Sequence, residues 1–229
     1  FCGGFELTGS GAFDAGAGVA DWRSLAHDHP VRDLGGRLTL RIFGSLKPVI
    51  GAVNGAAVGI GATMLLPMDY RIAAQHARLG FVFTQRGIVP EACSSWFLPR
   101  VVGINCALDW AMSGRFVEAE EASAARFFRS VHESEHLLAA ARTIADGLIG
   151  SSAPVSVALT RQMMWQGLTM DHPMAAHRID SRLMAMRGTH ADAHEGVAAF
   201  LEKRPPDFAG RVPDDLPPGF PCWPQRQFY

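Results

Sequence analysis

Hydrophobic and polar positions follow two different periods along the chain, and the change falls near residue 102. Before it, short apolar runs at 48–53 (PVIGAV) and 70–74 (YRIAA) have the length and composition of buried strands. The stretches 31–46 and 60–66 lie around these runs and are predicted to be helical. Strands that alternate with helices predict an α/β arrangement with parallel pairing.

The second part of the chain is predicted to be mostly helical. Residues 134–149 (SEHLLAAARTIADGLI) start with a serine that suits an N-cap, and their apolar residues recur at i, i+3 and i+4. Three further stretches behave in the same way: 153–166, 172–187 and 191–203.

The last segment, from residue 205 onward, is rich in proline and is predicted to be extended. It carries aromatic side chains that would be costly to leave in water. We therefore expect the tail to pack on its own subunit or on a neighbour. These side chains are Phe208, Phe220, Trp223 and Phe228.

Composition narrows the class of protein. The chain has 229 residues, of which 48% are hydrophobic and 19% charged, and this suits one large or two small globular domains. A formal charge of −1 without a basic block argues against nucleic acid as the main partner. The 4 cysteines are scattered and form no CxxC pair, which favours reduced thiols and a cytoplasmic location.

Neither a membrane span nor a signal peptide is expected. The longest apolar candidate, 49–68, is interrupted by several glycines and a proline, and no run reaches the roughly 18 residues that a membrane helix needs. The chain opens on Phe1 without a methionine and without a basic leader. We expect that an N-terminal piece is absent.

A glycine-rich corner lies within KPVIGAVNGAAVGIGATMLLPMD, residues 47–69. Gly59, Ile60 and Gly61 precede an apolar helix whose first N–H groups lack internal partners and point outward with the positive end of the dipole. Such a corner suits a developing negative oxygen. A dinucleotide cradle is disfavoured because Met64 stands where a third glycine would be, and no phosphate-loop Lys-Ser/Thr follows.

The opening FCGGFEL holds a second corner, at Gly3 and Gly4. Two amides from separate loops can converge on one oxygen and stabilise an oxyanion, an effect worth about 3–4 kcal/mol per donor. Taken alone, each corner favours the simpler interpretation of ordinary turn glycines.

Glu91 is the one acid in FVFTQRGIVPEACSSW, residues 81–96. It precedes a predicted helix start at 92–95, so it is either a helix cap or a buried base. Burial would raise its pKa and strengthen it as a base. The apolar neighbours expected to bury it are Phe81, Phe83, Val89 and Trp96.

Other candidate motifs are weak. HESEH at 132–136 matches the zinc pattern HExxH, but His132 ends a strand-like run and Ser134 suits a helix cap, so the histidines do not share one helical face. His190 and His194 are best explained by a solvated helix N-terminus. No GxSxG elbow marks a serine hydrolase.

Four segments together resemble the crotonase superfamily, the enoyl-CoA hydratase/isomerase family. FCGGFEL resembles its FCAGADL loop, and KPVIGAVNGAAVGIGATMLLPMDYRIAA its KPVIAAVNGxAxGGGxxLxxxCDxxxA segment. RFVEAEEA resembles GRxFxAxEA, and EGVAAFLEKRPPDF resembles EGxxAFxEKRxPxF. The likeness extends to about Phe208 but lacks the family's first strand–helix portion.

The resemblance implies an α/β fold: a crotonase-like spiral of ββα units followed by a C-terminal helical trimerisation region. The implied divisions are a core at 1–132 with its N-terminal part missing, a helical region at 133–204 and an extended tail at 205–229. It also implies an acyl-CoA thioester as substrate and assembly as a homo-trimer or as a hexamer built from two trimers. No cofactor beyond the coenzyme A of the substrate, no metal and no membrane partner are expected.

Site residues also follow from the resemblance. It implies an oxyanion hole made by the backbone N–H groups of Gly3 and Ile60. Phe200 and Lys203 match positions that touch the CoA of a neighbouring subunit in family trimers. The remaining positions expected to contact substrate are Gly4, Phe5, Gly59, Gly61, Thr63, Phe83, Pro90 and Trp96.

Two departures from the family pattern bear on the reaction. Family hydratases carry two glutamates at the positions that hold Thr63 and Phe83 here, and neither side chain exchanges protons at neutral pH. VPEACSSWFLP instead resembles the PEGCSS segment of a Δ3,Δ2-enoyl-CoA isomerase branch, in which the glutamate matched by Glu91 is the base. This favours a double-bond shift, because one carboxylate can act as base and then as acid. Hydration of a 2-enoyl-CoA and a catalytically silent acyl-CoA-binding scaffold remain the alternatives.

Arg126 stands where the family commonly has glycine. If this position requires φ > 0, the arginine costs about 1–2 kcal/mol.

Overall fold

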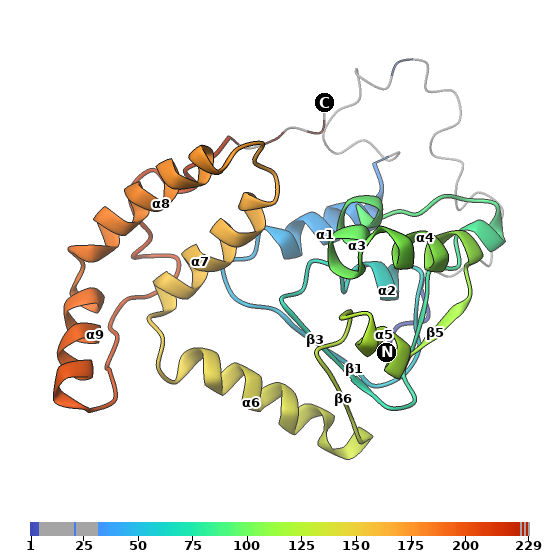
Figure 1. Ribbon diagram of the computed structural model, residues 1–229, viewed down its shortest axis with the longest axis horizontal. Coiled ribbons are helices and arrows are strands. Elements are labelled where there is room, and N and C mark those ends of the chain that lie inside the picture. Colours follow the sequence, from blue (N-terminus) through green and yellow to red (C-terminus); the bar gives the residue numbers. More distant parts are fainter. Residues whose placement is uncertain (5–20, 22–31, 225, 227, 229) are drawn as a thin grey trace. The chain divides into compact units, whose positions relative to one another are not determined.

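The computed structural model describes residues 1–4, 21, 32–224, 226 and 228. The chain forms two compact units, coloured along the sequence in Figure 1. The sheet unit consists of Phe1–Phe43, Val49–Ala141 and Arg226–Tyr229. The helical unit consists of Gly44–Pro48 and Arg142–Gln225.

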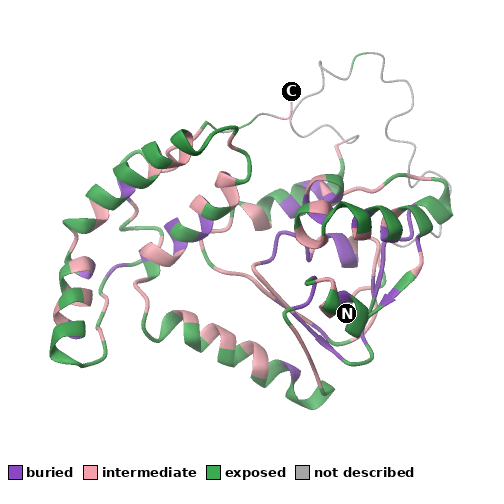
Figure 2. Cartoon of the chain, in the orientation of Figure 1, coloured by how far each residue is buried: buried purple, intermediate pink, exposed green. Residues whose placement is uncertain are grey.

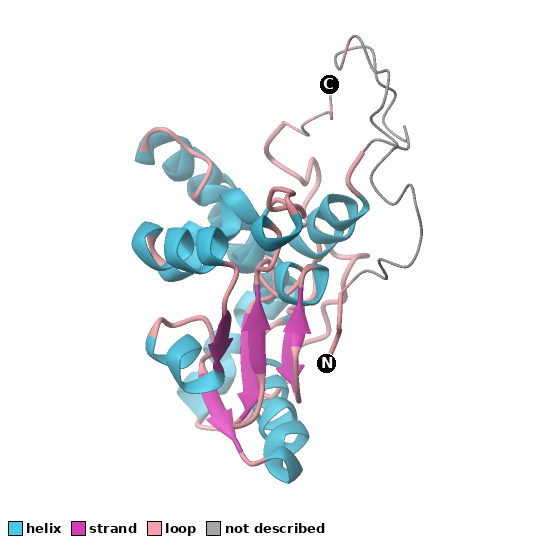
Figure 3. Cartoon of the chain, turned by 90° about the vertical axis from the view of Figure 1, so that its right-hand side faces the viewer, coloured by secondary structure: helices cyan, strands magenta, loops and turns pink. Residues whose placement is uncertain are grey.

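The first sheet of the sheet unit is parallel. Its strands are β1 (Ile50–Val53), β3 (Tyr70–Ala74) and β6 (Ser130–His132), in the order β1-β3-β6. Figure 3 shows the strands of the chain in magenta and the helices in cyan. Ile50 pairs with Tyr70, and Ile72 pairs with Ser130. The second half of β3 is buried without alternation, as expected for the central strand of a sheet covered on both faces.

The second sheet has the order β2-β4-β5, with β2 (Ala57–Val58), β4 (Arg78–Gly80) and β5 (Phe116–Glu118). β2 and β4 are parallel, whereas β4 and β5 are antiparallel. Cys2 extends this sheet through a parallel bridge to Ala57: its N–H donates to Ala56 O at 3.0 Å, and its carbonyl accepts from Val58 N at 2.9 Å.

The chain visits the two sheets in turn. After α1 (Leu34–Phe43), β1 and β2 lead into α2 (Ile60–Thr63), and then β3 and β4 lead into a helical layer. A last turn passes from β5 through α5 (Ala119–Ala124) to β6. The spiral of ββα units implied by the family resemblance is confirmed. The helical layer contains η3 (Thr84–Arg86), α3 (Ser94–Val102) and α4 (Ile104–Ser113).

The core of the sheet unit is apolar and holds an aromatic cluster. Phe81 stacks on Trp110, with ring centroids 6.2 Å apart, and meets Phe127 edge-on at 6.5 Å. These three side chains are at most 1% exposed. Figure 2 shows buried positions in purple along the strands and the helices beside them. Burial on this scale dominates the stability of such a unit, because each large apolar side chain contributes about 1.5–3 kcal/mol.

η4 (Ser134–His136) and the first turn of α6 (Leu137–Ile149) belong to the sheet unit, and the rest of α6 belongs to the helical unit, which confirms the C-terminal helical region. α7 (Pro154–Gly167) packs on α8 (Pro173–Gly188), and α8 packs on α9 (Ala191–Glu202). α7 and α8 start with proline, whose missing N–H needs no partner there.

The proline-rich tail packs on its own chain, one of the two outcomes expected. Val155, Leu159 and Leu183 form the core of the helical unit. The tail is free of helix and strand over its described residues, and it covers that core with several half-buried side chains. These are Val212, Leu216, Phe220 and Cys222.

Local predictions fail where elements are very short or broken. β2, β4 and β5 have two or three residues each, too few for a recognisable alternation. The helix predicted at 60–66 ends as α2 at Thr63 and continues in turns, because Pro67 lacks an N–H and disfavours a helical residue before it. The helix predicted at 31–46 is α1, and residue 31 lies outside the described residues.

The structure also bears on two expectations about single residues. Arg126 has φ 63°, so this position, at which the family commonly has glycine, does require the left-handed region. His190 caps α9, because its Nδ1 accepts the Asp192 N–H at 3.2 Å. His194 is exposed and His190 half-buried, in line with the expected helix N-terminus, whereas Asp192 between them is 3% exposed and pairs with Arg187 at 2.8 Å.

Within the described residues, the helices are too short or too polar for any of them to traverse a lipid bilayer. All four cysteines are free thiols: Cys2, Cys93, Cys106 and Cys222.

Candidate active site

Glu91 lies in the loop that leads into α3, and its side chain is directed at α2 rather than at the helix that follows it. Its Oε1 accepts a hydrogen bond from the Thr63 hydroxyl at 2.6 Å. The N-cap of α3 is Cys93, which makes no side-chain capping bond. The interpretation of Glu91 as a mere helix cap is therefore wrong.

Gly35 of α1 leaves room for the Glu91 carboxyl group. A Cβ atom at this glycine would lie 1.8 Å from Glu91 Oε2 and 2.9 Å from Ile60 Cδ1. The Gly35 Cα of α1 therefore lies close to the Glu91 carboxyl group on one side, and the Thr63 hydroxyl donates a hydrogen bond to that carboxyl group from α2. The sequence offered no sign of this role, since Gly35 lies in an ordinary helical stretch.

The surroundings of Glu91 favour its protonated form. Its pKa is raised from 4.5 to about 7, first by burial and then by the nearby carboxyl group of Asp33, through charge and hydrogen bonding. The Thr63 hydrogen bond opposes this shift. The direction predicted from burial is confirmed, but Val89, one of the expected neighbours, is 78% exposed and does not enclose the carboxyl group.

Asp33 is a site residue that the sequence analysis missed. Its Oδ1 accepts the Gly35 N–H and its Oδ2 the Gly36 N–H, both at 2.9 Å, so it caps α1. Its Oδ2 also accepts the Ala92 N–H at 2.6 Å. An aspartate just ahead of a helix is a readable N-cap signal, but nothing local links it to a residue 59 positions away.

The backbone after Glu91 is strained. Ala92 and Cys93 both have φ 56°, a region that costs residues with a Cβ about 1–2 kcal/mol. Ala92 stands where the PEGCSS segment has glycine. The Ser94 hydroxyl donates to the Glu91 carbonyl at 2.6 Å. Burial, followed by the charges of Asp33 and Glu91, raises the pKa of the Cys93 thiol.

The two glycine corners are in contact. A Cβ at Gly4 (φ 94°) would lie 2.8 Å from Val58 O, and one at Gly61 would lie 2.3 Å from Cys2 O. Gly59 has φ 56° and ψ −123°, a conformation suited to glycine. These requirements explain the glycines at Gly4, Gly59 and Gly61.

The amides of the two corners differ in their partners. The Gly59 N–H donates to Gly80 O at 2.9 Å. Among the described residues, no carbonyl of the chain accepts the N–H of Gly3 or of Ile60. Ile60 starts α2, whose last residue, Thr63, holds Glu91, so one short helix carries both an amide donor and the partner of the acid.

The remaining predicted substrate contacts, apart from Phe5, lie on the chain segments just before and after Glu91. Phe83 is 6% exposed and precedes η3, and Pro90 is half-buried beside Glu91. Trp96 packs edge-on against Phe97, with centroids 4.7 Å apart, within α3. Phe5 lies outside the described residues.

Phe200 and Lys203 belong to the helical unit. Phe200 is 81% exposed and shares the surface of α9 with Val197 and Leu201, which are also exposed. Lys203 is exposed and ends α9 in the left-handed region, with φ 54°.

The histidine motifs do not form a metal centre. His132 ends β6, and its Nε2 lies 2.7 Å from the Ser130 hydroxyl. His136 follows within η4, so the two histidines of HESEH do not share a helical face. Over the described part of the chain, no three His, Cys, Asp or Glu side chains are arranged to hold a metal ion.

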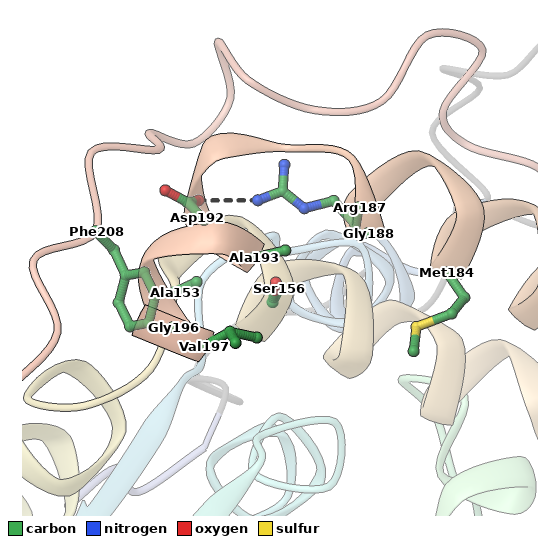
Figure 4. Close-up of a pocket in the computed structure, with 10 residues that line it drawn as sticks. All are labelled: Ala153, Ser156, Met184, Arg187, Gly188, Asp192, Ala193, Gly196, Val197 and Phe208. Carbon is green, nitrogen blue, oxygen red and sulfur yellow. Dashed lines mark hydrogen bonds and ion pairs between the residues drawn. The ribbon is translucent and has the colours of Figure 1, made fainter. Parts of the chain in front are cut away.

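A pocket of about 350 Å³ lies within the helical unit (Figure 4). Its lining is mostly apolar, with Met184, Val197 and Phe208 among the side chains. Its polar edge is the ion pair of Arg187 with the buried Asp192, whose Oδ1 also accepts the Gly210 N–H at 3.1 Å. This arrangement ties the α8–α9 turn to the tail and holds none of the predicted catalytic groups.

The chain matches a known family over most of its length. The sequence model described as enoyl-CoA hydratase/isomerase matches residues 5–211. Enoyl-CoA hydratase ACTT3 of Alternaria alternata is 38% identical over 209 residues, covering 91% of this chain and 67% of that protein. The 1,2-epoxyphenylacetyl-CoA isomerase of Escherichia coli K12 is 35% identical over 215 residues, covering 90% and 80%.

Solved structures agree. A probable enoyl-CoA hydratase/isomerase from Mycobacterium abscessus superposes with a TM-score of 0.68 at 34% identity, covering 74% of this chain and 68% of that one. A putative enoyl-CoA hydratase from Streptomyces coelicolor A3(2) gives 0.73 at 34% identity, covering 77% and 64%. The relatives thus include both hydratases and an isomerase.

Proposed function

This chain belongs to the enoyl-CoA hydratase/isomerase family and is an enzyme of that family, and from that premise we propose that it shifts the double bond of a 3-enoyl-CoA to the 2-position. The observation that carries the proposal is the half-buried carboxyl group of Glu91, held by the Thr63 hydroxyl at 2.6 Å. Thr63 occupies one of the two positions at which family hydratases have a glutamate.

The proposed reaction starts with removal of a proton from C2 of the acyl chain. The electrons of that C–H bond move toward the thioester, whose oxygen becomes negative. The N–H groups of Gly3 and Ile60 are proposed to bind this oxygen, and Ile60 adds the positive end of a helix. No cofactor beyond the coenzyme A of the substrate is required.

Glu91 is proposed to carry the proton between the two carbons. As a carboxylate it takes the C2 proton and becomes neutral. It then donates the proton to C4. The electrons of the C3–C4 double bond form the new C4–H bond, the enolate electrons form the C2–C3 double bond, and the thioester carbonyl is restored. A pKa of about 7 suits this exchange, because the group gives and takes a proton with similar ease near neutral pH.

Hydration of a 2-enoyl-CoA is the second candidate, since several relatives are named as hydratases. Addition of water divides two proton transfers between a base and an acid. Glu91 would have to manage both, because Thr63 and Phe83 stand where family hydratases have their glutamates.

Assembly into a homo-trimer, or into a hexamer of two trimers, is part of the proposal. It is supported by the exposed apolar side chains of Val197, Phe200 and Leu201 on α9, which a partner chain would cover. In such a trimer, Phe200 and Lys203 would contact the CoA bound to a neighbouring subunit.

Offering 3-enoyl-CoA and 2-enoyl-CoA separately tests the reaction, with products identified by mass and NMR. We expect 2-enoyl-CoA from the first substrate and no hydration of the second. Water incorporation from the 2-enoyl substrate, without migration from the 3-enoyl one, would establish the hydratase instead.

A Glu91→Gln variant tests the role of the acid. We expect turnover to fall by about 10³-fold or more, with CoA thioester binding retained, because the amide keeps the shape of the side chain but cannot take a proton. A fall in binding without a change in turnover would point to a scaffold that only binds acyl-CoA.

A further inference from the structure

Two acidic side chains from distant segments meet beside the centre described above. We propose that Asp33 is a positioning residue for Glu91: its carboxylate fastens the start of α1 to the Glu91 loop and keeps a second negative charge beside the Glu91 carboxyl group. The inference deepens the proposed function, because it rests on Glu91 as the proton carrier.

The hydrogen bonds of Asp33 exceed those of a helix cap. A cap needs only the N–H groups of the first turn, which Gly35 and Gly36 supply at 2.9 Å. The third donor, the Ala92 N–H at 2.6 Å, comes from a different segment of the chain. The Asp33 carboxylate therefore links two segments that both position the Glu91 side chain, because Gly35 lies against that side chain and Ala92 follows Glu91 directly in the chain.

The third bond holds the part of the loop that is otherwise least favourable. Ala92 is fully buried and has φ 56°, a value that alanine rarely adopts. The bond to Asp33 keeps the Ala92 amide in that orientation, and the direction of the preceding Glu91 side chain depends on it. Without the bond, the strain would be relieved by a rotation that moves Glu91 away from Thr63.

The charge of Asp33 acts on Glu91 directly. A second carboxylate nearby disfavours the ionised form of the first, so proton affinity rises. Burial acts in the same direction, and the hydroxyl of Thr63 on α2 acts against both. The Cys93 thiol and Arg32 are further titratable or charged groups near this loop in the described part of the chain.

Two substitutions separate the charge from the helix cap. Asp33→Asn and Asp33→Ser both retain an oxygen that can cap α1, and both remove the negative charge. A residue that only capped the helix would therefore tolerate both changes. Asp69→Asn is the matched control. The Asp69 Oδ2 also accepts a backbone N–H, that of Val49 at 2.7 Å, and the substitution removes the same charge just before β3.

The decisive measurement is an NMR titration of glutamate side chains labelled with 13C at the carboxyl carbon. The signal of Glu91 is assigned by its loss in Glu91→Gln. We expect the midpoint to move to lower pH by about one unit in Asp33→Asn and Asp33→Ser, and to stay in place in Asp69→Asn. Faster hydrogen exchange at the Ala92 amide is expected in both Asp33 variants.

Activity gives an independent readout. The acid limb of the kcat/KM profile should move in the same direction as the NMR midpoint, and kcat should fall about tenfold with little change in KM, because the base is less well placed. An unchanged Glu91 midpoint in folded Asp33→Asn and Asp33→Ser proteins would overturn the inference. Because the NMR titration needs no substrate, a shifted midpoint with an inert Glu91 would contradict the proposed reaction and leave the role of Asp33 standing.

Discussion

At the scale of single residues, the molecule holds several side chains in backbone conformations that favour glycine. Ala92, Cys93 and Arg126 all have φ values between 56° and 63°. The strain at Ala92 lies next to Glu91, where it contributes to the direction of the acid. Arg126 is exposed and lies between α5 and β6, away from the predicted site residues, so its strain has no evident use.

Arg126→Gly should therefore stabilise the protein. Removing the Cβ relieves about 1–2 kcal/mol of strain in the folded state. The greater conformational freedom of glycine in the unfolded chain offsets part of this gain in stability. We expect a net gain of about 0.5–1 kcal/mol, seen as a rise of about 2 °C in the melting temperature. Arg126→Ala keeps the Cβ and should show no gain. An equal gain in both variants would assign the effect to the arginine side chain instead of the backbone.

The raised pKa of Glu91 predicts two opposite trends with pH. Activity should rise through about pH 7, because only the carboxylate takes a proton from substrate. The folded state binds this proton more tightly than the unfolded state, so its contribution to stability falls as pH rises from about 4.5 to 7. Glu91→Gln should gain in melting temperature relative to the native protein from pH 5 to pH 8. A constant difference would contradict the shift.

At the scale of elements, α1 and α2 form the frame of the site. α2 has only four residues, yet it starts with the Ile60 amide and ends with the Thr63 hydroxyl that holds Glu91. α1 approaches closely only because Gly35 has no side chain. The separation of these two short helices therefore sets the position of the acid.

Gly35→Ala tests that separation. The new methyl group would overlap the ends of the Glu91 and Ile60 side chains, which can move aside, so stability should change by less than about 1 kcal/mol. Activity should fall at least about tenfold, because the displaced acid no longer faces the substrate.

Gly147→Ala is the matched control. It lies inside α6 with open space around it, so we expect full activity and a small gain in stability, about 0.5–1 kcal/mol. Equal activity of the two alanine variants would show that α1 does not constrain Glu91.

At the scale of the whole molecule, the two units differ in what they present to a partner. The sheet unit holds the acid and the glycine corners, and the helical unit carries exposed apolar residues on α9. A side chain such as Phe200, 81% exposed, is unfavourable in water and suits a surface that another chain covers.

Phe200 gives a prediction about assembly. Light scattering of the native protein should give the mass of three or six chains. Phe200→Ser should shift the distribution toward single chains and raise the KM for acyl-CoA, because a surface between subunits loses apolar area. Phe200→Leu keeps an apolar side chain and should retain the native mass. A native protein with the mass of one chain would refute the assembly proposal.

The long helices, the strands β1 and β3, the two glycine corners and the isolated acid Glu91 could all be predicted from the amino-acid sequence. These features are local, because periodicity, proline and glycine act on the residues around them. Family resemblance added the order of the spiral, which the sheet topology and the comparisons confirm.

The surroundings of Glu91, by contrast, follow from the folding of the chain in three dimensions. Thr63 lies 28 positions before it, and Asp33 lies 59 positions before Ala92. No local pattern says which distant segments meet when the spiral closes, and the shift in the pKa of Glu91 depends on that meeting. The short strands escaped prediction for the same reason, because pairing with distant neighbours, rather than their own two or three residues, makes them strands.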